Sequence, residues 1–511
     1  MVAAECEPYA KTGGLADVVD ALARALSGLG HEVDVYLPRY RGVVPPPGAL
    51  ERSTLTVPLG PGAAAGGWPG GAWGGWADEG SVQVDLISGR ANGYRLRLVD
   101  HPPSFDRAGY YGEGQADYRD YPDNGARFAV LGRAALEAIR AEGRPVDVLH
   151  GHDWHAAPAL LLLTTRYRDD PQLAGVATLL TCHNLAYHGW VPRDRAGALD
   201  LPAAIGAPDG IDLLREAVAR ADLVNTVSPT FARESCSAEY GGGLDDVLRA
   251  RGDRYVGILN GIDPTLWDPA TDHALRVRYS AADPSGKAIG KRTKCGLLGF
   301  DLQAPPDEAP DLLWDERGAP LFGMVSRLDG QKGFDLLAGA AEELVAAGAR
   351  LLVQGQGHAE LIAGLRALAE RRPDRVAVLE RFDRDEARRI YAASDVFLMP
   401  SRFEPSGQGQ MIAWRYGTLV LARRTGGLAD TVVDADADGA RGNGFMFAAA
   451  DAGALLEAGR RAIAAYRDAP RWSQLVRRVM GLDHSWGARA AREYESACAR
   501  AMAIHGGVTG A

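Results

Sequence analysis

The sequence predicts an α/β protein built from two Rossmann-like, doubly wound domains with parallel sheets. Short apolar runs of strand length alternate with longer amphipathic stretches along most of the chain, which is the pattern of βαβ units. A glycine turn between strand and helix occurs twice, and Thr-Gly-Gly-Leu-Ala-Asp at 12–17 recurs at 425–430. With 511 residues, the chain has room for two or three domains of roughly 150 residues each. We therefore expect two domains of similar fold that face one another.

Composition and charge exclude several classes of protein. Apolar residues make up 46% and charged residues 24%, as in ordinary soluble globular proteins. The net charge of −10 argues against a broad surface for nucleic acid or anionic membrane. Five scattered cysteines without a CxxC pair favour reduced thiols over a disulfide framework or a zinc site. No apolar run approaches the ~20 residues of a membrane span, so we expect a cytoplasmic protein. The abrupt start suggests that the chain begins a few residues late.

The first domain is expected over residues 1–255. It opens with the end of a strand, a glycine turn at 11–14, a helix at 15–29 and a strand at 33–38. Lys11 lies in that turn, where two glycines let backbone approach a ligand. A phosphate contact and an ordinary surface lysine are both compatible with this position. Residues 42–80 are rich in glycine and tryptophan and are expected to form a loop or irregular hairpin.

Polar residues follow three further strands of this domain. The strands are expected at 146–150, 178–184 and 221–229, and the polar residues that end the first two are His152, Asp153, His155, His183 and Asn184. The carboxyl ends of parallel strands meet at one sheet edge, so these side chains should converge. The spacing of the two histidines around Asp153 is not a standard metal-ligand set, and a hydrogen-bonding crevice explains it equally well. Asp123-Asn124 is expected to cap a helix through Ile139.

The second domain is expected over residues 256–485, with the hinge just before Val256. A basic helix at 286–298 carries four cations and is expected to present a solvated face. A strand at 320–326 leads into Arg327 and Lys332, which flank a turn. Arginine offers a planar fork of donors and lysine a point charge, a pair suited to a diphosphate. Two solvated surface cations are the alternative.

The stretch at 400–410 organises the second domain. It follows an apolar strand at 396–399 and precedes a helix that begins near Met411. Glu404 and Gly407 therefore lie at the carboxyl end of a strand, where ligands bind in open α/β sheets and helix N-termini favour anions. The alternative is an ordinary loop with a solvated glutamate.

Two other motifs are weak. The glycine pair at 355–357 lacks the matched acidic residue of a dinucleotide site, so an NAD-dependent oxidoreductase is set aside. The Asp-x-Asp strings at 383–385 and 434–438 are expected to be a helix start and a solvated loop, and not a metal site.

These motifs, in this order, resemble those of bacterial glycogen synthases and plant starch synthases, retaining glycosyltransferases of GT-B fold that add glucose to an α-1,4-glucan. The resemblance is carried by residues 11–18, 152–155, 183–187, 259–263, 326–333, 401–407 and 423–432. It implies two Rossmann-like domains that face one another across a cleft with the active site in it. It also implies ADP-glucose as donor, glycogen as acceptor and no metal or other cofactor. It also implies that residues 486–511 form a C-terminal helix that packs back on the first domain.

The resemblance further implies a set of site residues. The catalytic residues would be Lys11, His183, Arg327, Lys332 and Glu404. The substrate-binding residues would be Lys11, Gly13, Gly14, Asp17, Asp153, Asn184, Asn260, Arg327, Lys332, Phe382, Gly407 and Thr425. In such an enzyme Arg327 and Lys332 hold the donor diphosphate, Lys11 reaches it on domain closure, and Glu404 lies beside the transferring glucose.

The chain departs from the family's pattern at three places. The family's Glu-Pro-Cys-Gly-Leu-Thr-Gln is here Glu-Pro-Ser-Gly-Gln-Gly-Gln at 404–410, and Gly409 removes a hydroxyl expected near the phosphates. Phe382 stands where a tyrosine is frequent near the adenine. Residues 42–80 also differ in character. Two alternatives thus remain: a related transferase with another donor, such as UDP-glucose, or another acceptor, and a glucan-binding relative with weak activity.

Overall fold

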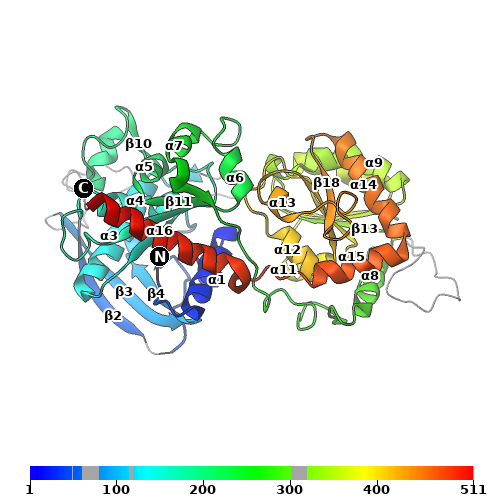
Figure 1. The fold of residues 1–511 in the computed structure, drawn as a ribbon, viewed down its shortest axis with the longest axis horizontal. Coiled ribbons are helices and arrows are strands. Elements are labelled where there is room, and N and C mark those ends of the chain that lie inside the picture. Colours follow the sequence, from blue (N-terminus) through cyan, green and yellow to red (C-terminus); the bar gives the residue numbers. More distant parts are fainter. Residues whose placement is uncertain (49, 60–79, 114–118, 301–318, 382, 510–511) are drawn as a thin grey trace. The chain divides into compact units, whose positions relative to one another are not determined.

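The computed structural model divides the chain into two compact units (Figure 1). Unit 1 comprises Met1–Val227, Ala232–Ile258 and Trp486–Ala511, and unit 2 comprises Ser228–Phe231 and Leu259–Ser485. The structure describes residues 1–48, 50–59, 80–113, 119–300, 319–381 and 383–509. Within these ranges, no helix is both long enough and apolar enough to cross a membrane.

Unit 1 is an α/β unit with twelve strands and eight α-helices among the described residues, and one of these helices, α6 (Pro229–Glu234), has its residues 229–231 in unit 2. Its strands are β1 (Asp34–Pro38), β2 (Glu51–Pro58), β3 (Ser81–Ala91), β4 (Tyr94–Asp100), β5 (Gly112–Glu113), β6 (Arg119–Asp120), β7 (Val148–His152), β8 (Ala177–Cys182), β9 (Trp190–Pro192), β10 (Gly210–Asp212), β11 (Leu223–Thr226) and β12 (Tyr255–Gly257). Its helices are α1 (Gly14–Gly28), α2 (Pro102–Phe105), α3 (Asn124–Glu142), α4 (Asp153–Leu163), α5 (Leu213–Arg220), α6 (Pro229–Glu234), α7 (Asp245–Ala250) and α16 (Ala491–Thr509).

Val2 lies at the centre of the main sheet of unit 1. It makes parallel bridges to Tyr36 of β1 and to Gly151 of β7, and so joins two four-stranded sheets of order β12-β11-β8-β7 and β1-β4-β3-β2. The first of these sheets is parallel, whereas β3 pairs antiparallel with both β4 and β2. Counted in chain order from Val2, the strands around the centre follow the doubly wound order, with a switch point between Val2 and β7.

Strand β2 corrects the expectation that residues 42–80 form a loop or irregular hairpin. Glu51–Pro58 pairs with β3 over its whole length, while residues 60–79 lie outside the described residues. The alternation of Leu55 and Val57 with polar residues is a strand pattern, but the neighbouring glycine-rich sequence obscured it.

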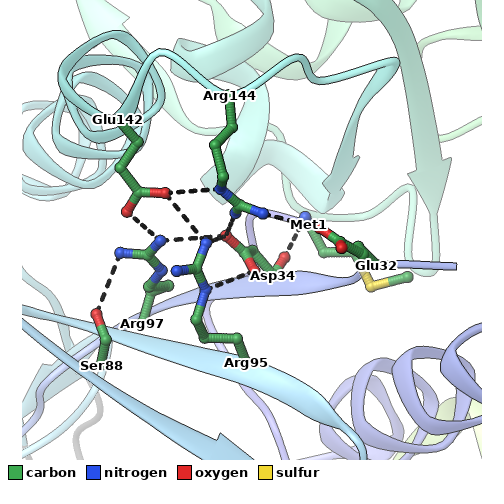
Figure 2. Close-up of polar contacts among 8 residues, drawn as sticks. All are labelled: Met1, Glu32, Asp34, Ser88, Arg95, Arg97, Glu142 and Arg144. Carbon is green, nitrogen blue, oxygen red and sulfur yellow. Dashed lines mark hydrogen bonds and ion pairs between the residues drawn. The ribbon is translucent and has the colours of Figure 1, made fainter. Parts of the chain in front are cut away.

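Helix α3 begins as expected, but not by the expected cap. Asp123 is its N-cap residue and accepts no capping hydrogen bond; its carboxylate binds the guanidinium of Arg107 instead, at 2.6 and 2.8 Å. At the far end of α3, Glu142 pairs with Arg95, Arg97 and Arg144, and all three arginines also pair with Asp34 of β1 (Figure 2). This charge network ties α3 to the edge where β1 and β4 pair.

Unit 2 holds a six-stranded sheet that is parallel throughout. Its strands are β13 (Leu321–Val325), β14 (Arg350–Gln354), β15 (Val376–Leu379), β16 (Val396–Met399), β17 (Leu419–Arg423) and β18 (Gly444–Phe447). Its helices are α8 (Ser285–Leu297), α9 (Phe334–Ala346), α10 (Ala363–Arg371), α11 (Arg384–Ala393), α12 (Gly409–Arg415), α13 (Gly426–Thr431), α14 (Ala452–Arg467) and α15 (Ala469–Met480). The order β15-β14-β13-β16-β17-β18 is the doubly wound arrangement, with a switch point between β13 and β16.

Helix α8 overturns the expectation of a solvated basic face. Lys287 and Lys291 are only 3% and 4% exposed. The Lys287 ammonium donates to the carbonyls of Ala392 and Ser394 and to the Thr418 hydroxyl at 2.7–2.8 Å, and Lys291 pairs with Asp395 at 2.8 Å. A buried cation is tolerated when acceptors replace its lost water, and these acceptors lie more than 100 residues away along the chain.

Helix α16 packs against α1, β8 and β11 of unit 1. Tyr494 and Ala497 of α16 share an apolar cluster with Val18 and Leu22 of α1. The Tyr494 hydroxyl also accepts a hydrogen bond from the side-chain amide of Asn225 at 3.2 Å. The last helix of the chain therefore covers one face of the sheet in unit 1.

Candidate active site

The expected cations and carboxylate of unit 2 meet at the switch point of its sheet. Arg327 and Lys332 follow β13, and Glu404 follows the neighbouring strand β16. Strands β13 and β16 lead to helices on opposite sides of the switch, so a crevice opens between their carboxyl ends. Sequence reasoning placed these residues at strand ends, and the strand order explains why they converge.

Lys332 and Glu404 form a direct ion pair. The Lys332 Nζ lies 2.7 Å from Oε2 and 3.0 Å from Oε1 of Glu404, and their side chains are 18% and 9% exposed. Ser401 is buried, and its Oγ donates to Glu404 Oε2 at 2.8 Å. Arg327 differs, since its side chain is 67% exposed and its guanidinium lies 3.4 Å from the carboxylate of Asp329. The site thus holds one fixed cation, one fixed carboxylate and one arginine that extends into solvent.

Glycines hold the turn that carries Glu404. Gly426 has φ +44°, and a Cβ there would lie 2.1 Å from the Glu404 carbonyl oxygen. A Cβ on Gly427 would lie 1.9 Å from the Ser406 carbonyl oxygen, and the Gly427 N–H donates to the Glu404 carbonyl at 3.0 Å. The glycine turn before α13 is therefore packed against the backbone of the Glu404 turn. Thr425, expected to bind substrate, is 1% exposed in this structure.

Three other residues of unit 2 were expected to bind substrate: Gly407, Asn260 and Phe382. Gly407 has φ +68°, a conformation that favours glycine. Asn260 is 8% exposed, and among the described residues its Oδ1 is a buried acceptor without a hydrogen-bond partner. Phe382 lies outside the described residues.

Unit 1 also has a glycine turn between a strand and a helix at the switch point of its sheet. Lys11 and the turn 11–14 follow the Val2 segment, whereas His152 ends β7 and Asp153 begins α4. The Lys11 ammonium pairs with Asp17 at 2.5 Å and with Glu7 at 3.2 Å. Gly13 is the N-cap of α1, and Gly14 is its first residue. The N–H groups of Thr12 and Gly13 donate to the carboxylate of Glu5.

Asp153 organises the turn that contains His183 and Asn184. It adopts the left-handed conformation with φ +56°, which is uncommon for a residue other than glycine. One carboxylate oxygen accepts the N–H of His183 at 2.6 Å and that of Asn184 at 3.3 Å. Burial raises the pKa of Asp153 to about 7, against the lowering by these two N–H groups. The Asp153 carboxylate therefore holds the backbone of the neighbouring turn at 183–184.

The histidines of this crevice are neutral at physiological pH. Burial lowers the pKa of His183 and that of His155 to about 3, and it lowers the pKa of His152 well below its ordinary value. His152 Nδ1 and His183 Nε2 lie 3.0 Å apart and share a hydrogen bond. His155 stacks on Trp154, with ring centroids 4.1 Å apart. His183 can therefore offer a neutral hydrogen-bonding ring to a sugar, but not a positive charge.

Two residues were missed by sequence reasoning. Ser401, although part of the quoted motif, received no role, yet it orients the Glu404 carboxylate. Glu5 received none either, because its partners at 12, 13 and 111 are revealed only by the fold. A polar residue just after a central strand was the signal that could have indicated Glu5.

The aspartates of the two Asp-x-Asp strings are engaged by protein groups. Asp383 caps α11 by accepting the N–H of Glu386 at 2.9 Å. Asp434 and Asp436 pair with Arg461, and Asp438 pairs with Arg441. Across the described ranges, no group of three or more His, Cys, Asp or Glu side chains is arranged to hold a metal ion.

Comparisons with known proteins find relatives of one family along the whole chain. The profile described as "Starch synthase catalytic domain" matches residues 1–250, and "Glycosyl transferases group 1" matches residues 319–465. A glycogen synthase of Syntrophotalea carbinolica is 39% identical over 513 residues, which covers 99% of each chain. A glycogen synthase of an Anaeromyxobacter species is 42% identical over 502 residues, covering 97% of each.

Solved structures point the same way. The catalytic domain of starch synthase IV from Arabidopsis thaliana, bound to ADP and acarbose, superposes with a TM-score of 0.82 at 32% identity and 98% coverage of both chains. A sucrose-phosphate synthase from Thermosynechococcus elongatus, at 18% identity and a TM-score of 0.56, shares the fold. By sequence and by fold, the chain belongs to the family of bacterial glycogen synthases and starch synthases, glycosyltransferases of GT-B fold.

Proposed function

We propose that the protein transfers glucose from ADP-glucose to the non-reducing end of an α-1,4-glucan such as glycogen, with retention of the anomeric configuration. The contact between Lys332 and Glu404 carries this proposal, because it places a fixed cation and a fixed carboxylate side by side at the switch point. ADP as the nucleotide is supported by the starch synthase IV relative, which was solved with ADP and acarbose bound.

The reaction separates charge in a way that suits these residues. The bond between the anomeric carbon and the diphosphate breaks, which builds negative charge on the leaving group and positive charge on the carbon. Lys332, Arg327 and Lys11 would stabilise the diphosphate, and Glu404 would stabilise the sugar. The acceptor's 4-hydroxyl forms the new bond on the leaving-group face and passes its proton to the departing phosphate. Neutral His183 would bind a sugar hydroxyl.

We propose that the transfer needs no metal and takes place in the cytoplasm. The cations Lys332, Arg327 and Lys11 would take the place that Mg²⁺ has in many nucleotide-sugar enzymes. The Asp-x-Asp strings do not suit a divalent ion, because their carboxylates are engaged by Arg441, Arg461 and the start of α11.

The test is glucose incorporation into glycogen by the purified protein, with ADP-glucose and UDP-glucose supplied in parallel and EDTA present. Incorporation from ADP-glucose alone is expected. Incorporation from UDP-glucose would reassign the donor, and loss of activity in EDTA would overturn metal independence. If the folded protein transfers glucose from neither donor but is retarded in gels that contain glycogen, it is a glucan-binding relative with weak activity.

A further inference from the structure

Glu5 is a buried carboxylate with four donors around it. It is 3% exposed, although the turn above it, residues 11–14, is exposed. Its Oε2 accepts the N–H groups of Thr12 and Gly13, at 2.6 and 3.1 Å. Its Oε1 accepts the hydroxyls of Thr12 and Tyr111, both at 2.5 Å. A short turn does not need a buried charge in order to form. The burial of the Glu5 carboxylate therefore indicates a functional role.

The position of Glu5 connects it to Lys11. It follows the central Val2 segment at the switch point of unit 1, and its charge lies at the N-terminus of α1, where free N–H groups attract an anion. Gly13, the N-cap of α1, has no side chain to cap the helix. Glu5 instead accepts the N–H groups of Thr12 and Gly13, which lie just before the first helical residue, and it thereby fixes the turn that begins with Lys11.

Tyr111 extends the connection to the histidine side of the crevice. Its hydroxyl donates to Glu5, and its ring packs on His155 with centroids 4.8 Å apart. His155 in turn stacks on Trp154, next to Asp153. One carboxylate thus links the Lys11 turn to the residues that follow β7.

We propose that Glu5 is a positioning residue that holds the Lys11 turn for the donor diphosphate. It also occupies the Thr12 and Gly13 N–H groups, so these two groups are not available to bind the diphosphate. This inference rests on the proposed function, in which Lys11 contacts the diphosphate. Misplacing a charged group by about 1 Å costs on the order of 10²-fold in rate, and that is the loss expected when Glu5 is truncated.

The test compares two substitutions and an added carboxylate. In Glu5→Gln, the side-chain amide oxygen can still accept the N–H groups of Thr12 and Gly13. The amide NH₂ can donate to the hydroxyls of Thr12 and Tyr111 once these rotate to accept. We therefore expect only a small loss in kcat/KM. In Glu5→Ala, all four bonds are lost, and a loss on the order of 10²-fold is expected. Added acetate should restore part of the Glu5→Ala activity by occupying the same place. Failure of acetate to restore any activity would overturn the proposal.

Two further measurements separate positioning from general destabilisation. In a Lys11→Ala background, Glu5→Ala should cost almost nothing more, because both substitutions remove the same interaction; fully additive losses would overturn the proposal. Hydrogen exchange at Thr12 and Gly13 should be slow in the wild type, faster in Glu5→Ala and slow again with acetate. This measurement needs no substrate, so it stands even if the proposed transfer fails.

Glu137→Ala is the matched control. Glu137 also accepts a tyrosine hydroxyl at 2.5 Å, from Tyr167, but it lies on α3 away from the Lys11 turn. It should leave exchange at Thr12 and Gly13 unchanged and should show no response to acetate. An acetate response of equal size in this variant would mean that the effect is nonspecific, and it would refute the role of Glu5.

Discussion

The ammonium of Lys332 lies 2.7 Å from the carboxylate of Glu404, and the two residues come from turns 72 positions apart in the chain. Neither side chain is freely solvated. The cation and the carboxylate to which we assign opposite charges of the proposed reaction therefore lie in direct contact.

Replacing Lys332 by alanine should lower kcat/KM for the donor by about 10²–10³-fold, or about 2.7–4 kcal/mol, as when one preorganised charge donor is lost. It also leaves the Glu404 carboxylate without its cation. The measurement is steady-state kinetics with varied ADP-glucose. Lys11→Ala and Arg327→Ala should have effects in the same range, and wild-type turnover in all three variants would rule out the proposed diphosphate site.

Replacing Glu404 by alanine should reduce kcat more than it weakens donor binding. The charge that Glu404 stabilises develops only in the transition state. Donor affinity is measured by calorimetry and turnover by glucose incorporation. A variant that binds ADP-glucose poorly but turns over normally would contradict this role. A Ser401→Ala variant should show the same split more weakly, since Ser401 only orients the carboxylate.

Gly409→Thr should lower the KM for ADP-glucose, because it restores a hydroxyl where the family has threonine. A Cβ at 409 would lie 3.2 Å from Phe397 and 3.4 Å from Met399 and Tyr391, all contacts with the ends of side chains. Small shifts of these side-chain ends therefore accommodate the added Cβ. Gly409→Val, of similar shape but without a hydroxyl, is the control. Equal kinetics for the two variants would show that the hydroxyl is irrelevant.

Gly426→Ala should lower the free energy of unfolding of unit 2 by about 1–3 kcal/mol or more. A loss of about 1–3 kcal/mol is the usual cost of forcing extra atoms into a packed site. The added Cβ would meet the Glu404 carbonyl oxygen at 2.1 Å, at a backbone φ of +44°. Urea unfolding followed by circular dichroism measures the loss. Gly439→Ala is the control, since a Cβ there meets nothing within 4 Å. Equal midpoints for the two variants would contradict the packing described for the Glu404 turn.

The buried histidines should make unit 1 sensitive to acid. The pKa values of His183 and His155 are about 3 in the folded protein, compared with about 6.5 in an unfolded chain. Between these values the unfolded chain binds more protons, so stability falls as the pH drops from 6.5 toward 3. The slope is at most about 1.4 kcal/mol per pH unit for each histidine.

Asp153 opposes this trend. Its pKa of about 7 exceeds the unfolded value of about 3.9, so its contribution grows as the pH falls from 7 to 4. The two histidines outweigh the single aspartate, and a net loss below pH 6 is expected. Urea midpoints at pH 6.5 and 4.5 measure it. His155→Gln should reduce the difference, whereas His273→Gln, at a side chain that is 72% exposed, should not.

Sequence reasoning found the strands and the residues at their ends, because apolar runs and glycine turns are local signals. It could not find which of these ends are neighbours, since that depends on strand order. It judged Lys287 and Lys291 solvated, because their acceptors at 392–395 and 418 are remote in the chain. It also overlooked β2, where two apolar residues on one face gave a weak pattern next to glycine-rich sequence.

The partition of the chain has a consequence for biosynthesis. Apart from four residues at 228–231, unit 2 is one uninterrupted segment, Leu259–Ser485, whereas unit 1 includes α16 from beyond that segment. The whole segment Leu259–Ser485 is therefore synthesised before α16, the helix that covers the sheet of unit 1. During synthesis the apolar face of unit 1 that α16 covers therefore stays exposed while unit 2 is made, and transiently exposed apolar surface of this kind favours aggregation.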